Sequence, residues 1–597
     1  MNTILTKTLL AASLSALLMP SLVHADEAEL LNRIEALARE LAELKSQVEA
    51  GKARTDENVK RTEAVQKKIA KVEDRSLAKW LDLGGDYQFR VDSLQGKTRT
   101  FTDVKSTFDN AQQALQADFF ANPSTEPGSS TFFGGMGLST AGALSALMQF
   151  SQNMGAVQNY QQASAFLADP MNAGLVQGIG GFAATLPAFK PDNATLYTNR
   201  FGLDMHIKAT QNVVVTTRLL MYKTFGANDA SAVTNAGSAP FFADRVGTFD
   251  GTLGHIPSSD FLNVDRAYAT WSNIFEQNLW FSVGRRPSSD GVPRNLKQNR
   301  ARPGNGGTPS LLVDYAFDGM SLGYAPDSEA LPGAYLKLCY GRGFESGFRS
   351  PPNNSLDDTD MFGIQFVPID TDPLRIWTQW NRGFNIFDAP VMRDTFFGNT
   401  LPETNLGDLE WWGAGAIGVF ADLGQGDLNY FAEIGHSITH PNNNVSSQFG
   451  FQGLLTGGFF NPEAPSSKTG TAIALGLRYD LAYDLPATTK IGFEYNHGSK
   501  NWITFAPAAD DVWTSKVGTR GNVYDAYVIL QLNKKALASY DAKAFFRLGF
   551  QYYDFNYSGS NNWVGAPVKL SEVNGQLMTT TPLDHAYDLY GTFEVIF

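Results

Sequence analysis

Apolar and polar side chains alternate along the last stretch of the chain. Between Leu583 and Phe597 one parity is mainly apolar and ends on Phe593, Val595 and Phe597, whereas the other parity carries Asp588, Tyr590, Thr592 and Glu594. A period of two predicts a β-strand with one apolar face and one polar face. A soluble sandwich strand would give the same alternation. In a membrane barrel the final strand must close against the first with its outward face in lipid, and we expect this strand to be such a closing strand.

The same alternation recurs along most of the chain. It predicts about 16 antiparallel strands, an even number within the range of single-chain transmembrane barrels. The fold class that follows is an all-β transmembrane barrel. The predicted strands are 81–92, 196–209, 213–223, 262–272, 279–286, 310–324, 333–343, 360–368, 374–386, 408–421, 427–440, 470–482, 489–501, 522–532, 541–557 and 583–597.

The predicted connections alternate between short and long, which gives a second indication of a barrel. Short connections lie near 210–212, 273–278, 369–373, 422–426 and 483–488. Long connections lie near 93–195, 224–261, 287–309, 387–407, 441–469 and 558–582. Bacterial barrels have short periplasmic turns and longer outer loops. We therefore expect the N-terminal arm and the C-terminus in the periplasm.

The segment before the first strand contains two predicted regions. Residues 1–25 have the apolar core and small cleavage residues of a signal peptide. Residues 26–76 place apolar residues at heptad spacing, which predicts a parallel, oligomeric coiled coil, with a lone solvated helix as the alternative. The residue types at the heptad positions do not decide whether the coiled coil has two or three helices. They are Leu30, Ile34, Leu37, Leu41, Leu44, Val48, Val65, Ile69 and Val72. Residues 80–597 then form the barrel.

Charge and cysteine content narrow the functional classes. The formal net charge of -13 argues against a nucleic-acid partner. The single cysteine, Cys339, excludes an internal disulfide, an iron–sulfur site and a c-type haem motif, so we expect no cofactor. No hydrolase or metal-ligand motif is present, and we expect no enzyme. Barrel enzymes with Asp, His or Ser groups on their strands stay as an alternative.

Charged residues on the polar parity of the strands predict a wet, charged lumen. A channel of this kind selects solutes by its radius and by its fixed charges. The candidate lumen residues are Asp86, Arg90, Arg200, Asp204, Lys208, Arg218, Glu494, Lys543 and Arg547.

Two long loops are candidates for controlling the passage of solutes through the barrel. Loop 93–195 has no charged residue between Glu126 and Asp169, and Ala141–Phe150 predicts a short helix. We expect this loop to fold into the barrel mouth or onto a neighbouring subunit, with a flexible surface loop as the alternative. Loop 287–309 is basic instead. Folded into the pore it would concentrate anions, and outside it would contact lipopolysaccharide phosphates. The constriction candidates, in this loop and at the end of the strand before it, are Arg285, Arg286, Arg294, Lys297, Arg300 and Arg302.

Together, the signal, the heptads, the strand number and the terminal Phe resemble Gram-negative general porins, and more closely porin-like proteins with a periplasmic coiled coil. The resemblance implies a homotrimer in the outer membrane, inserted by the barrel-assembly machinery and in contact with lipid and lipopolysaccharide. It also implies a third loop that narrows the channel. The expected function is passive diffusion of small polar or anionic solutes. Alternatives are an envelope tether that contacts peptidoglycan, and a barrel sheath for an electron-transfer partner.

Overall fold

The computed structural model divides the chain into two units, Met1–Lys79 and Trp80–Phe597. The structure describes residues 35–52 except 37, 44, 47, 50 and 51. It also describes 80–597 except 133–135, 226–256, 258, 290, 292, 301–308, 349–355, 396–397, 486, 507–510 and 533–541. The described positions of 35–52 are helical. The predicted signal peptide and most of the predicted coiled coil lie outside the described residues.

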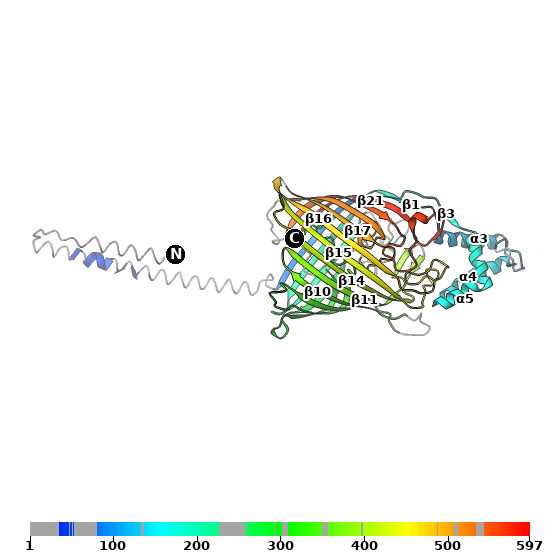
Figure 1. Cartoon of the computed structure of the whole chain (residues 1–597), viewed down its shortest axis with the longest axis horizontal. Helices are drawn as coiled ribbons and strands as arrows, with labels where there is room; N and C mark the ends of the chain where they lie inside the picture. The colour runs from blue at the N-terminus through cyan, green and yellow to red at the C-terminus, as the bar shows by residue number, and fades with distance from the viewer. Residues whose placement is uncertain are drawn as a thin grey trace, which may run out of the picture. The chain divides into compact units, whose positions relative to one another are not determined.

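Sixteen antiparallel strands form a closed barrel in the second unit (Figure 1), as the sequence predicts. Every strand pairs with its neighbour in the chain, and the last strand pairs with the first. The strands are β1 (Leu81–Thr98), β4 (Asp192–Lys208), β5 (Val213–Thr224), β6 (Ser259–Trp271), β7 (Leu279–Pro287), β8 (Ala316–Tyr324), β9 (Tyr335–Phe344), β10 (Thr359–Asp370), β11 (Leu374–Phe387), β14 (Asn405–Phe420), β15 (Gly426–Pro441), β16 (Thr469–Leu485), β17 (Ala487–Gly498), β18 (Gly521–Leu532), β19 (Lys543–Phe555) and β21 (Leu583–Ile596).

The seam between β1 and β21 closes the barrel. Phe89 lies opposite Phe593 in the register, and the pairing continues to Asp86 opposite Ile596. Beyond the strand, the amide of Phe597 donates to the carbonyl of Gly85 at 3.0 Å, and the amide of Gly85 donates to the carbonyl of Phe597 at 2.8 Å. The predicted closing strand is therefore confirmed as the partner of the first strand.

Connections alternate between a short-turn end and a long-loop end, as predicted. Most strand ends differ by a few residues from the prediction, and two segments differ by more. Strand 310–324 begins only at Ala316, because Leu311 and Leu312 are buried and lie against the inner wall. Loop 93–195 is shorter, because β1 continues to Thr98 and β4 begins at Asp192. Leu94 faces inward and lies beneath other loops. An apolar residue therefore occupies the otherwise polar face of β1 at this point, although the strand continues.

The first long loop is largely helical. It contains β2 (Phe101–Asp103), α3 (Val104–Ala121), α4 (Thr140–Gly155), α5 (Tyr160–Ala168), α6 (Pro170–Gly180) and β3 (Ala184–Leu186). Each helix begins after a residue whose side chain accepts a hydrogen bond from a first-turn amide: Asp103, Ser139, Asn159 and Asp169. The predicted helix at Ala141–Phe150 is confirmed within α4.

These helices lie beyond the long-loop end of the barrel (Figure 1). They bury their own apolar core, which includes Leu115, Leu147 and Phe150. The ring of Phe150 is 5.8 Å from that of Phe460, in the loop between β15 and β16. The first loop is thus anchored on another long loop of the same chain. No helix in the described part of the chain combines the length and apolar content of a membrane span.

The remaining short elements lie in the connections. They are η4 (Ile274–Glu276), β12 (Met392–Thr395), β13 (Gly398–Thr400), η5 (Lys516–Gly518), η6 (Leu570–Glu572) and β20 (Leu577–Met578). The strand β20 pairs with β2, which joins the last long loop to the first one.

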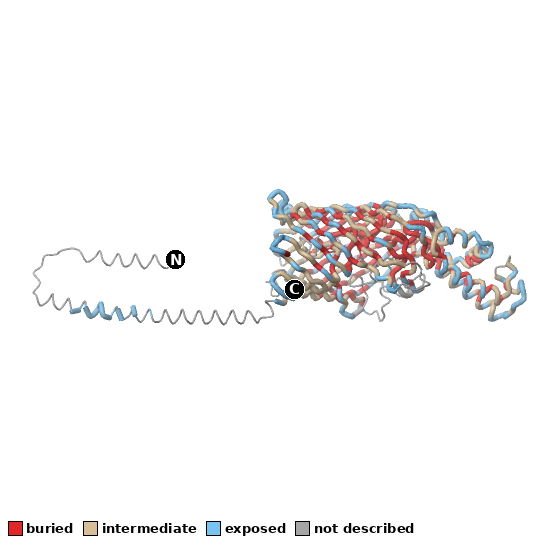
Figure 2. The backbone as a smooth tube through the Cα atoms, turned by 90° about the horizontal axis from the view of Figure 1, so that it is seen from below, coloured by how far each residue is buried: buried red, intermediate tan, exposed pale blue. Residues whose placement is uncertain are grey.

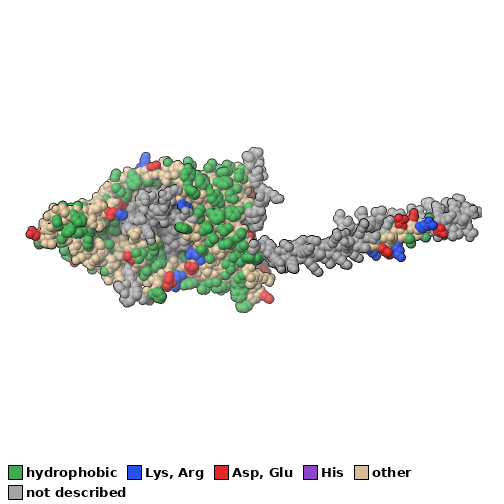
Figure 3. Space-filling model, turned by 180° about the vertical axis from the view of Figure 1, so that it is seen from behind, with side chains coloured by type: hydrophobic (Ala, Val, Ile, Leu, Met, Phe, Trp, Pro, Cys, Tyr) green, Lys and Arg blue, Asp and Glu red, His purple; other side chains and the backbone are tan. Residues whose placement is uncertain are grey.

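The outward face of the barrel wall is apolar, as the sequence predicts. The inward face differs from the expected wall of a water-filled lumen. Outward residues such as Leu548, Ile434 and Trp412 are exposed, and hydrophobic side chains cover much of the wall (Figure 3). Buried positions concentrate in the middle of the barrel and in its long-loop half (Figure 2). A wide water-filled lumen would leave inward side chains exposed, so the described lumen is instead largely filled by protein.

Candidate functional site: a loop-filled lumen

The loop between β7 and β8 (the β7–β8 loop, residues 288–315) extends across the lumen. In the closed strand order, β16 to β19 lie on the side opposite β7. On that side, Lys297 Nζ is 2.6 Å from the carboxylate of Asp525 in β18. Arg478 of β16 donates to the carbonyls of Leu296 at 2.8 Å and Arg300 at 3.3 Å. The basic loop is thus docked on the opposite wall.

Further hydrogen bonds fix the tip of this loop from β19. Lys543 Nζ donates to the carbonyl of Asn299 at 2.9 Å, and Arg547 donates to the carbonyl of Lys297. Lys543 and Arg547, which the sequence places in the lumen, therefore bind loop backbone there. Since charge-assisted hydrogen bonds are the stronger ones, this tip is held firmly.

Asp525 also receives a second inward loop, between β17 and β18 (the β17–β18 loop, residues 499–520). Lys516 Nζ is 3.7 Å from Asp525 and bonds to Glu494 of β17. The hydroxyl of Tyr590 donates to Asp525 at 2.9 Å. Burial opposes protonation of Lys516, but the carboxylates of Glu494, Asp525 and Asp511 outweigh it and raise its pKa above the usual value. Both loops therefore carry a buried cation to one wall carboxylate.

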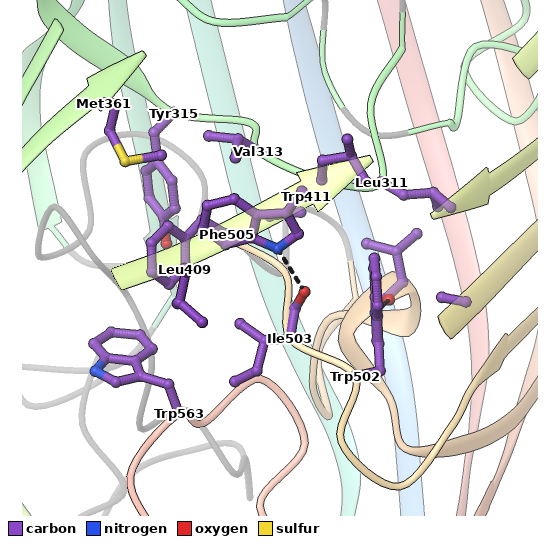
Figure 4. Close-up of a cluster of buried hydrophobic side chains, with 14 of the residues drawn as sticks. Leu311, Val313, Tyr315, Met361, Leu409, Trp411, Trp502, Ile503, Phe505 and Trp563 are labelled. Carbon is purple, nitrogen blue, oxygen red and sulfur yellow. Dashed lines mark hydrogen bonds between the residues drawn. The ribbon is translucent and has the colours of Figure 1, made fainter. Parts of the chain in front are cut away.

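An aromatic core joins the two loops to the wall in the long-loop half (Figure 4). Trp411 of β14 points inward and donates from Nε1 to the carbonyl of Ile503 at 2.9 Å. The rings of Trp411 and Phe505 are 5.0 Å apart. Trp502 is fully buried and donates to the carbonyl of Val517 at 2.8 Å. We call this cluster the aromatic plug, defined by Leu312, Trp411, Trp502, Phe505 and Trp563.

Glycines in the inner wall make room for the aromatic plug. A Cβ built on Gly435 of β15 would lie 2.6 Å from the Trp502 ring and 2.9 Å from Leu312. A Cβ on Gly413 of β14 would lie 3.0 Å from Leu312. These distances are shorter than van der Waals contact, so the wall sequence matches the plug side chains.

The inward charges of β1, β4, β5 and β21 form two ion-pair groups. In the first group, Arg90 bonds to Asp92 at 2.6 Å and to Asp588 at 2.7 Å, and all three side chains are buried. In the second, Arg218 bonds to Asp86 and, at 2.5 Å, to Asp204. The sequence predicts solvated lumen charges here, whereas the structure pairs them with one another.

Other predicted lumen residues extend these groups. Arg200 is 3.3 Å from Asp86, and Arg547 is 2.8 Å from Glu594. Glu494 accepts from Tyr527 at 3.1 Å and from Lys516. Lys208 lies exposed at the short-turn end of β4.

The structure places the constriction candidates in different positions. Lys297 and Arg300 reach the opposite wall, and Arg286 faces the lumen from β7. Arg285 does not belong to the site, because adjacent strand residues face opposite sides. It shares the outward parity of the exposed Val283 and lies opposite Asp318. Arg294 is half-buried in the β7–β8 loop, and Arg302 lies outside the described residues.

Sequence reasoning missed the residues that receive the loops. The inward face of β18 carries Val523, Asp525, Tyr527 and Ile529, so it has no simple polar pattern. Trp502 and Phe505 could have indicated from the sequence that this loop folds inward, because a long loop that carries large aromatic side chains tends to bury them. In the described part of the chain, no group of His, Cys, Asp and Glu side chains is arranged to hold a metal ion.

Among solved structures, similar barrels include OprB of Pseudomonas putida, with 10% identity, 88% of this chain and 96% of that chain covered, and a TM-score of 0.38. The anion-selective porin from Comamonas acidovorans has 10% identity, coverage of 87% and 99%, and a TM-score of 0.36. The outer-membrane channel DcaP of Acinetobacter baumannii has 9% identity, coverage of 87% and 98%, and a TM-score of 0.34. These values add nothing to the fold that the strand topology already establishes.

Comparison with curated proteins gives no match. Comparison with protein families gives one match, which spans residues 190–597 and therefore runs from β4 to the end of the barrel. It includes both inward loops and every wall strand that receives them. The chain belongs to this family, DUF3373, which is described as a protein of unknown function.

Proposed function

We propose that the protein is an outer-membrane channel of narrow bore for small polar solutes, with a preference for anions. The observation that carries this proposal is the β7–β8 loop, which crosses the lumen and reaches Asp525 through Lys297. A barrel with an apolar outer face suits the outer membrane, and a loop folded inward restricts what passes. The channel performs no covalent chemistry in this proposal.

The bore is narrow because protein fills the lumen. Only the space that the aromatic plug and the ion pairs leave is open to solute. A solute of modest size then passes close to fixed charges, and basic residues of the β7–β8 loop favour anions there. Displacement of the β7–β8 loop would widen the path.

Single-channel recording in planar bilayers tests the proposal. We expect purified, folded protein to give small, discrete conductance steps with a reversal potential that favours anions in a salt gradient. Joint replacement of Arg294, Lys297 and Arg300 with Gln should lower the anion preference and raise the conductance, because Asp525 loses one of its two loop cations, Lys297. The matched control is Arg342→Gln, on the outward parity of β9.

Absence of steps from folded protein contradicts the channel. An unchanged reversal potential in the triple variant contradicts the role of the loop in selectivity. One observation favours a second function, that of an envelope tether with a closed barrel as its anchor. The aromatic plug is fully buried and fits glycines in the wall, as a permanent closure would.

A further inference from the structure

The inward charges of the barrel differ in how much water they meet. On the side where the two inward loops dock, the side chains of Asp525 and Arg547 are fully buried, and that of Lys516 is 2% exposed. On β4 and β6 the side chain of Asp204 is 34% exposed and that of Arg266 is 26% exposed. Protein therefore seals one side of the lumen, whereas water reaches the other.

Uncharged inward residues show the same difference. Ile529 of β18 and Phe545 of β19 are fully buried. Thr216 of β5 and Tyr268 of β6 lie opposite each other in the register, and both are half-buried. A long charged side chain can reach water from a buried backbone, but the short side chain of Thr216 cannot. The difference is thus a property of the two wall faces.

A bulge in β6 sets the charges of the water-exposed face. Arg218 lies opposite Arg266 in the register, but the next residue, Leu219, lies opposite Val264. Asp265 is the extra residue, and a bulge turns a side chain away from the direction it has in a regular strand. The carboxylate of Asp265 is 3.2 Å from Arg266 Nε and 3.7 Å from Arg218 Nε. Two successive residues of β6 are therefore on the lumen side.

These charges form one row with alternating sign across three strands. Asp265 lies between the two guanidinium groups of Arg266 and Arg218, and Arg218 bonds to Asp204 at 2.5 Å. Asp204 and Arg266 are the members of this row that water reaches most. Because each charge has a partner of opposite sign, removal of one leaves the other sign in excess on the wall.

The described part of the β7–β8 loop docks on the opposite wall and borders the same space. Lys297 binds Asp525 there, while Arg300 is close enough for its charge to attract Asp86 of β1. Asp86 also bonds to Arg218. The space between the loop tip and the row of charges is therefore bounded by groups of both signs.

We propose that solutes pass along the inner faces of β4, β5 and β6, where Asp204 and Arg266 are the charges that they meet. This inference rests on the proposed function and deepens it, because it locates the open part of the channel. The row itself favours neither sign, so the anion preference comes from the loop side, and the row sets how strong that preference is.

A thiol reagent tests the location of the path without conductance. Thr216→Cys and Thr592→Cys would be made separately together with Cys339→Ser, which removes the single natural thiol. Thr592 is the matched control, because it faces the lumen from β21 but is 4% exposed. We expect anionic sulfonatoethyl methanethiosulfonate to label the folded Thr216→Cys protein about tenfold faster or more. Equal rates, or faster labelling of the Thr592→Cys protein, overturn the proposal.

Charge variants in planar bilayers test the role of the row. Asp204→Asn should raise the anion-to-cation permeability ratio about twofold, and Arg266→Gln should lower it by a similar factor, because each leaves the opposite charge in excess. The control Arg342→Gln, on the outward parity of β9, should leave the ratio unchanged. Each of the two variants is sufficient by itself if the other does not fold, and heat-modifiable gel mobility checks folding. A shift of opposite sign, or no shift, overturns the role of the row.

The two experiments separate this inference from the proposed function. Conductance steps without preferential labelling of the Thr216→Cys protein refute the path along β4 to β6 and leave the channel in place. Folded protein that gives no steps refutes the channel. Preferential labelling would in that case identify a closed, water-filled recess on this face, and the path would be refuted with the channel.

Discussion

Asp388 is a buried carboxylate that joins two long loops. Its oxygens accept from the amides of Glu403 at 3.0 Å and Thr404 at 3.3 Å. They also accept from Ser446 Oγ at 2.6 Å and Gln448 at 3.0 Å, in the loop between β15 and β16. Burial nevertheless raises its pKa above the ordinary value of 3.8. Burial and the charge of Asp388 also raise the pKa of Glu403.

These raised pKa values predict a loop contact that weakens as the pH rises. The folded state binds these protons more tightly than the unfolded state, so the stabilisation is complete at low pH. It is lost as the pH rises from about 4 through the raised pKa of Asp388. Hydrogen exchange should show falling protection factors for the amides of Glu403 and Thr404 across this range.

Two variants distinguish this titration from a general effect of pH. Asp388→Asn should remove the part of the pH-dependent change in protection at Thr404 that comes from Asp388, and burial of Glu403 should leave a smaller part in place. Asp422→Asn, in an exposed turn between β14 and β15, should leave it in place. Protection that rises with pH in the unaltered protein would contradict the assignment.

At the level of single elements, the hydrophobic pattern of the sequence is sufficient to predict the strands of the barrel wall. The strand number, the closing partner and the alternation of short and long connections could be predicted, because lipid imposes one apolar face on every strand. The pattern fails where the lumen contains protein in place of water. Leu94 and Leu311 are apolar and inward, and β14 places Leu409 and Trp411 on its inner face.

The candidate site could be predicted only in part for the same reason. The basic composition of the β7–β8 loop marks it, and Lys297 was among its candidates. Its partner Asp525 is 228 positions away, and nothing local on β18 indicates which loop it receives. Arg285 was included because composition alone does not separate the two sides of a strand.

At the level of the strand, Gly435→Ala tests the fit between wall and plug. The added methyl would press on Trp502 and Leu312, and overpacking of this kind costs about 1–3 kcal/mol. We expect lower thermal stability and a larger or noisier conductance in planar bilayers. The matched control is Gly591→Ala on the outward parity of β21, where a Cβ meets only Leu548 at 3.2 Å. Equal behaviour of the two variants would contradict a plug that depends on wall glycines.

For the whole molecule, the two compact units lead to a test of assembly. We propose that the N-terminal segment forms an oligomer of three chains through its heptads. Deletion of residues 26–76, with the signal peptide retained, should leave a folded barrel because all sixteen barrel strands lie in the second unit. The oligomer should then be lost, as measured by light scattering in detergent.

The same deletion separates the channel from the tether. Envelope detachment with unchanged solute uptake favours the tether, whereas loss of the oligomer alone favours the channel. Trimers that persist after the deletion would place the assembly contacts on the barrel wall.

The seam between β1 and β21 has a consequence for biogenesis. Gly85 and Phe597 exchange two backbone hydrogen bonds, although nearly the whole barrel sequence separates them. Contacts between residues so distant in sequence form slowly, and until they form both terminal strands are unpaired edges that can join other chains. We therefore expect closure of this seam to come late in insertion, and we expect the nascent sheet to need protection of its two unpaired edges until then.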